Sequence, residues 1–162
     1  MERRSASVLL GIVIITLVLR LTVAFSIDGL TYPSYFHVRQ VENIAQQGYP
    51  EWHDPYSYGG REIRFLPLYH YLVALPAFFL DVESAAKIVT NLLYSLIPVI
   101  VFLIARVISQ DEESSLVAGI VSAILPILFT PNAVGPESLF FVLVLVCIYM
   151  FMMCEKPNYL YY

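Results

Sequence analysis

Charged residues are scarce in this chain. Only 14% of its 162 residues are Asp, Glu, Lys or Arg, whereas soluble domains carry about a quarter. Hydrophobic residues make up 59% of the chain, and the mean hydropathy is +0.72. The formal net charge is −4 and the sequence has no basic stripe to neutralise phosphates, so we expect no nucleic-acid partner. The composition indicates an integral membrane protein.

Cysteine is also rare, with only Cys147 and Cys154 in the chain. Both lie in or at the end of one apolar run and on one face of the helix expected there. A disulfide between them is therefore geometrically implausible. We interpret both as small apolar residues, which is how free cysteines in apolar surroundings usually behave.

Apolar runs long enough to approach the thickness of a membrane occur four times. Lipid satisfies no backbone polar groups, so each run is expected to be helical. The predicted spans are residues 7–25, 88–108, 114–130 and 138–153. They form one all-α membrane domain over residues 1–162, a helical bundle whose long first outer loop carries amphipathic or interfacial helices.

The first apolar run sets the expected orientation of the chain. It follows Arg3 and Arg4, so the positive-inside rule places the N-terminus in the cytoplasm. A cleaved signal peptide is the alternative, although the run is long for one and Arg20 interrupts it. Because Arg20 lies near the outer end of the run, we expect its side chain to snorkel to the interface.

The proline-rich segment 65–80 is ambiguous. It is short for a crossing, and Pro67 and Pro76 remove backbone donors that lipid cannot replace. We interpret it as a re-entrant or interfacial part of the outer loop, 26–87. The turn 131–137 then lies on the same side of the membrane as this loop, whereas a crossing by segment 65–80 would move the turn inside.

Polar residues gather in the first half of the outer loop. The pattern predicts a short helix with Ser34 as its N-cap and a stop at Gly48. Its apolar face suits the membrane surface. At the helical period, His37 and Arg39 point to nearly opposite faces, so they cannot grip one ligand together from this helix.

Arginines and acids supply the candidate site residues. Arg39, Arg61 and Arg64 can form paired bonds to a phosphate, although lipid headgroups would satisfy them equally well. Asp54 directly follows a histidine, and adjacent residues seldom ligate one metal. Glu137 is the most informative acid because it begins an apolar run, where a carboxylate is solvated, bound or favoured by the helix dipole. An aromatic-rich boundary loop is the plainer interpretation of this region.

Several stretches, taken in order, carry a resemblance to a known family. They are residues 35–39 (YFHVR), 54–61 (DPYSYGGR) and 135–139 (GPESL). Together they resemble the membrane part of oligosaccharyltransferase catalytic subunits, most closely the archaeal and bacterial single-subunit forms. That family of C-type membrane glycosyltransferases uses polyprenyl-phosphate-linked sugar donors. The resemblance implies sugar transfer at the outer face of a prokaryotic cell membrane.

The resemblance also implies roles for individual residues. Glu137 and Asp54 would be catalytic, and Glu137 would also ligate Mg²⁺ or Mn²⁺. His37, Arg39 and Arg61 would contact the donor. The implied partners are membrane lipid, the polyprenyl-phosphate-linked donor, and a second chain that supplies the family's further helices and soluble domain.

Two acids of the family pattern are missing. Pro33 stands where the family has an aspartate, and Gly135 replaces the first acid of a pair. Hard cations prefer several oxygen ligands, so Glu137 alone does not make a metal site. The alternative function is therefore a non-catalytic relative or fragment that binds lipid or a partner subunit. A transporter component is a third hypothesis, disfavoured because no charged residue sits in mid-span.

Overall fold

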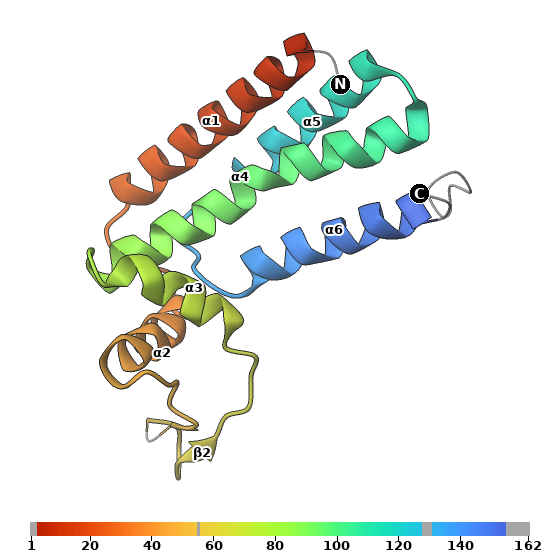
Figure 1. Cartoon of the computed structure of the whole chain (residues 1–162). Coiled ribbons are helices and arrows are strands. Elements are labelled where there is room, and N and C mark those ends of the chain that lie inside the picture. The colour runs from red at the N-terminus through yellow and green to blue at the C-terminus, as the bar shows by residue number, and fades with distance from the viewer. Residues whose placement is uncertain (1–2, 55, 128–130, 155–162) are drawn as a thin grey trace.

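The computed structural model describes residues 3–54, 56–127 and 131–154. These residues form an all-helical protein with one small pair of strands (Figure 1). In chain order the elements are α1 Arg3–Ser26, α2 Ser34–Gln47, β1 His53–Asp54, β2 Arg61–Glu62, α3 Leu68–Ala77, α4 Val82–Ser109, α5 Glu112–Ile127 and α6 Glu137–Cys154. The strands pair antiparallel, with Asp54 opposite Arg61.

Among the described helices, three are long and apolar enough to cross a membrane. They are Ser5–Ser26 within α1, the whole of α4 and the whole of α6. They coincide with three of the predicted spans. The fourth predicted span, 114–130, corresponds to α5, whose 16 residues end at Ile127. Since residues 128–130 lie outside the described part, a fourth crossing stays a prediction.

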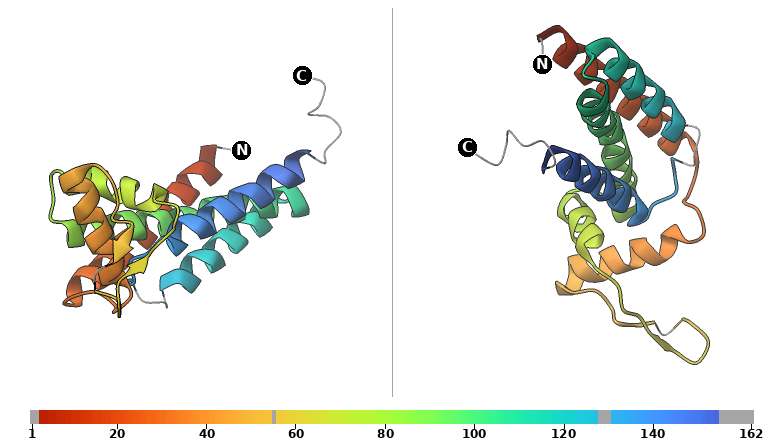
Figure 2. Two further views of the ribbon diagram at one scale, coloured as in Figure 1. Left: turned by 90° about the horizontal axis from the view of Figure 1, so that it is seen from below. Right: turned by 90° about the vertical axis from the view of Figure 1, so that its right-hand side faces the viewer.

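The central helix of the bundle is α4, against which α1, α5 and α6 all pack (Figures 1 and 2). The start of α4 lies beside the end of α1, where Lys87 Nζ approaches the carbonyl oxygen of Ile27 at 3.4 Å. It also lies beside the start of α6, because Asn91 Nδ2 donates to the Pro131 carbonyl at 2.9 Å. Helices α4 and α6 therefore run in one direction, and α5 returns the chain between them. We call this end of the bundle, which also carries α2 and α3, the loop end.

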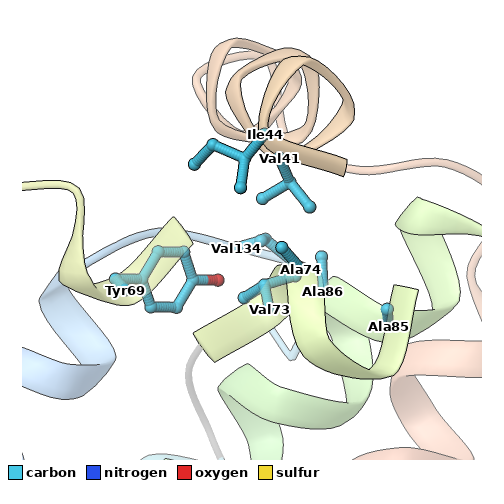
Figure 3. Packing of buried hydrophobic residues seen from close by; sticks show 8 residues of the cluster. All are labelled: Val41, Ile44, Tyr69, Val73, Ala74, Ala85, Ala86 and Val134. Carbon is cyan, nitrogen blue, oxygen red and sulfur yellow. The ribbon is translucent and has the colours of Figure 1, made fainter. Parts of the chain in front are cut away.

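A compact apolar cluster joins the elements of the loop end (Figure 3). Its members come from α2, α3, the start of α4 and the turn before α6: Val41, Ile44, Tyr69, Val73, Ala74, Ala85, Ala86 and Val134. Full burial of one large apolar side chain contributes about 1.5–3 kcal/mol. The apolar face of α2 is thus buried inside the protein, where we had expected it to face the membrane surface.

The ends of α2 confirm one capping prediction and correct another. Gly48 ends the helix with a φ of 85°, and its N–H donates to the Ile44 carbonyl. This left-handed conformation suits glycine. Ser34, however, is the first helical residue, and Pro33 precedes it without a side-chain cap. The Ser34 hydroxyl instead accepts a hydrogen bond from the backbone N–H of Val134 at 2.8 Å, which ties α2 to the turn before α6.

The proline-rich segment 65–80 contains the ten-residue helix α3. A helix of that length spans about 15 Å, roughly half of a hydrocarbon core. It packs against α2 and α4 at the loop end. This agrees with our interpretation that the segment does not cross, while its depth relative to lipid stays a prediction.

The side chain of Arg20 is buried inside the bundle and does not extend to the interface as expected. Its side chain is 1% exposed, its Nε–H donates to Asn91 Oδ1 at 2.9 Å, and its guanidinium lies 4.6 Å from the ring centroid of Tyr94. The expectation that Arg20 snorkels to the interface is wrong, because an amide oxygen and an aromatic face inside the bundle offer it partners.

Candidate functional site

The turn before α6 is held by three hydrogen bonds, two to the outer loop and one to α4. Thr31 N–H donates to the Asn132 carbonyl at 3.4 Å, and Val134 N–H donates to Ser34. The third bond joins Asn91 to Pro131 inside the bundle. Two segments about a hundred residues apart in sequence therefore lie side by side at the loop end.

Glu137 and His37 meet across Gly135. A Cβ atom on Gly135 would lie 2.1 Å from Glu137 Oε2 and 3.4 Å from His37 Cδ2. The carboxylate and the imidazole thus approach one point from α6 and α2. Glu137 is exposed and half-buried His37 borders it, so both reach solvent. An acidic side chain at position 135, as in the family pattern, would require the Glu137 carboxylate to move.

A second histidine lies behind the first. His37 Nδ1 and His70 Nε2 are 3.0 Å apart and share a hydrogen bond. His70 lies on α3 and is 1% exposed. Burial lowers the pKa of His37, and burial together with the neighbouring His37 lowers the pKa of His70 to about 4. Both imidazoles are therefore neutral at pH 7.

The tyrosine next to His70 is locked in place. Tyr69 is 1% exposed, and its hydroxyl shares a 2.7 Å hydrogen bond with that of Thr90 on α4. Burial raises the pKa of Tyr69, so it stays a neutral hydroxyl. This contact holds the start of α3 against the bundle and with it the position of His70.

The buried histidine predicts a pH-dependent stability. The pKa of His70 is about 4 in the folded protein, below its ordinary 6.5. Stability is therefore complete above pH 6.5 and is lost as the pH falls toward 4, by on the order of 2 kcal/mol. Thermal unfolding in detergent at a series of pH values measures this loss. His70→Phe should flatten the profile, whereas the same change at exposed His53 should leave it; equal profiles for both variants would contradict the assignment.

Arg39 and Asp54 form a separate group on the other face of α2. Arg39 Nη2 lies 2.7 Å from Asp54 Oδ1, and its guanidinium lies 4.8 Å from the ring centroid of Tyr56. Asp54 Oδ1 also accepts from the Tyr56 backbone N–H at 3.1 Å. The pair thus neutralises its own charge and fastens the strand pair to α2. The prediction that His37 and Arg39 face apart is confirmed.

Arg61 lies on the strand pair, opposite Asp54. Its exposed side chain lines an open cavity of about 380 Å³ together with Phe36, Ser57 and Arg64. The structure therefore brings His37 and Glu137 together, and it brings Arg39, Asp54 and Arg61 together in a second group.

Two residues at the site were not singled out from the sequence. His70 stands in an apolar helix, and its link to His37 spans 33 positions. Asn91 lies near the end of a predicted span and holds the turn through Pro131. A polar residue inside an apolar run is the signal that could have pointed to both.

The expected divalent cation has no set of ligands here. Across residues 3–54, 56–127 and 131–154, no three His, Cys, Asp or Glu side chains gather closely enough to hold a metal ion. Glu137 offers one carboxylate, whereas Mg²⁺ and Mn²⁺ prefer several oxygen ligands. These residues do not fit such a site, and the proposed chemistry involves no metal.

Comparison of the chain with protein-family models, with curated proteins and with solved structures finds no match in any of the three. The resemblance to oligosaccharyltransferase subunits rests on the motifs of the chain itself. The class that the fold defines is a multi-helix protein in which three of the described helices are long and apolar enough to cross a membrane.

Proposed function

We propose that the chain acts on a lipid-phosphate-linked sugar donor at the outer face of a membrane, as a relative of oligosaccharyltransferase catalytic subunits. One observation carries the proposal. Glu137 and His37, which belong to two of the motifs behind the resemblance, face each other across Gly135. Hydropathy and local propensity do not require Glu137 and His37 to lie close together, whereas a shared site does.

The proposal includes four membrane crossings. Helices α4 and α6 run in one direction, so the chain must return between them, and α5 is the segment that does so. Its 16 residues extend about 24 Å, close to the length of α6. With a cytoplasmic N-terminus, the loop end faces outward and lies level with lipid headgroups.

The proposed chemistry is substitution at the anomeric carbon of the donor. The acceptor's nucleophilic atom forms a bond to that carbon as the carbon–oxygen bond to phosphate breaks, and the phosphate leaves with the electron pair. Glu137 accepts the acceptor's proton. Arg61 and Arg64 are exposed and suit the phosphate. Arg39 and Asp54 form an ion pair with each other, which favours a positioning role for the pair.

The alternative is a non-catalytic protein that binds lipid or a partner subunit. The closed Arg39–Asp54 ion pair and the glycine at position 135 favour it. A second chain that supplies further helices is compatible with either proposal. Helix α6 packs against α4 and leaves many large apolar side chains exposed, among them Phe140, Phe141 and Phe151.

Transfer in proteoliposomes tests the proposal. The full chain is reconstituted in proteoliposomes free of any other transferase and incubated with a polyprenyl-phosphate donor that carries a radiolabelled sugar. The proposed function predicts movement of label from the lipid phase to an acceptor. Retention of donor on the protein without transfer supports the non-catalytic alternative, and neither retention nor transfer would contradict the proposed function.

A further inference from the structure

The hydrogen bond between His37 and His70 can run in either direction. A neutral imidazole carries one proton, so one of its nitrogens donates and the other accepts. Either His37 donates through Nδ1 and His70 accepts at Nε2, or the roles are reversed. The choice determines whether His37 Nε2, the nitrogen that does not face His70, is a donor or an acceptor.

The second nitrogen of His70 decides between the two. His70 Nδ1 is buried and has no hydrogen-bond partner among the described residues. If His37 donated, the proton of His70 would sit on this nitrogen as an orphaned buried N–H, which is rare in folded proteins. If His70 donates, only a lone pair is left without a partner, which proteins tolerate more often. The proton of His70 therefore belongs on Nε2.

The tautomer of His37 follows. Its Nδ1 accepts, so its proton sits on Nε2. Cδ2, which is bonded to Nε2, is the ring atom nearest the Gly135 position, where Glu137 Oε2 also lies. His37 Nε2 is not among the buried nitrogens without a partner, and Glu137 is exposed. The N–H thus lies on the side of the ring that faces the Glu137 carboxylate.

We propose that His70 is a positioning residue that holds His37 in the Nε2–H tautomer, so that His37 presents a hydrogen-bond donor opposite the carboxylate acceptor of Glu137. A donor and an acceptor that approach one point from two sides fit a hydroxyl group, which accepts one hydrogen bond and donates another. A phosphate fits poorly, because the carboxylate repels it. Within the proposed function, on which this last step rests, a sugar or acceptor hydroxyl binds here and the phosphate lies elsewhere.

Nitrogen NMR of the imidazoles tests the tautomer directly. The chain has three histidines, so the His53→Gln and His37→Gln variants assign the spectrum of the ¹⁵N-labelled protein in detergent. We expect a directly bonded proton on His70 Nε2, a through-hydrogen-bond coupling to bare His37 Nδ1, and a proton on His37 Nε2. A proton on His37 Nδ1 would overturn the proposal. His70→Phe should remove the coupling, and His53→Gln should keep it.

Titration of the same sample tests the hydroxyl assignment. Methyl glucoside, raised to saturation, should move the His37 Nε2–H resonance, and inorganic phosphate should not. Absence of a shift with the glycoside, or a shift with phosphate alone, would overturn that assignment. Both readouts are spectroscopic and do not depend on sugar transfer. A failure of sugar transfer therefore does not affect the tautomer result, and the opposite tautomer would not by itself contradict the proposed function.

Discussion

On the proposed function, we expect Glu137→Gln to lower sugar transfer from a lipid-linked donor by at least about 100-fold. The amide keeps the size of the side chain but cannot take a proton, and positioned general bases contribute about 10²–10⁴-fold to rate. Glu137 is exposed in the first turn of α6, beside the His37 ring. The transfer rate in proteoliposomes, at equal amounts of folded protein, measures the effect.

Glu113→Gln is the matched control for this variant. Glu113 is also an exposed acid in the first turn of a helix, α5, at the other end of the bundle (Figure 1). Each acid is favoured by its helix dipole, typically by about 0.3–1 kcal/mol. An equal loss of transfer rate in both variants would mean that Glu137 acts only as an acid at the start of a helix. An unchanged transfer rate in Glu137→Gln would contradict its proposed role.

Asn91→Leu destabilises the protein by about 2–4 kcal/mol. Asn91 is fully buried, accepts from Arg20 Nε–H at 2.9 Å and donates to the Pro131 carbonyl at 2.9 Å. Leucine has a similar volume but no polar atoms, and each buried group left without its partner costs about 1–3 kcal/mol. Unfolding in detergent, followed by circular dichroism, measures the loss.

The same substitution at Asn43 provides the control. Asn43 is half-buried on α2, and its amide donates to Glu51 at 3.2 Å near the surface. We expect a loss below about 1 kcal/mol, because solvent replaces the lost partner. Equal losses at the two positions would mean that the contact between Arg20, Asn91 and the turn contributes nothing beyond an ordinary polar contact.

The helices could be predicted because their signals are local. Apolar runs located α1, α4 and α6, and a glycine located the end of α2. Helical periodicity placed His37 and Arg39 on opposite faces. Each of these depends on residues within a few turns of one another, so a single sequence contains the necessary information.

The site could be predicted only in part, because its contacts are remote in sequence. Ser34 looked like a helix cap, yet its hydroxyl accepts from a backbone N–H 100 positions away. Arg20 looked like a snorkelling side chain, yet its partner Asn91 is 71 positions away. Local propensity does not predict contacts between residues that are remote in sequence. These contacts are decided by the free-energy cost of burying polar groups, which arises only when the helices pack.

The gathering of these groups at one membrane face is tested most directly by cysteine accessibility in sealed vesicles. In a background that lacks Cys147 and Cys154, single cysteines replace Tyr58 of the outer loop, Pro136 of the turn and Ser114 at the start of α5. An impermeant maleimide should label the first two from the outer side only, and the third from the cytoplasmic side only. Labelling of positions 58 and 136 from opposite sides would contradict a shared site.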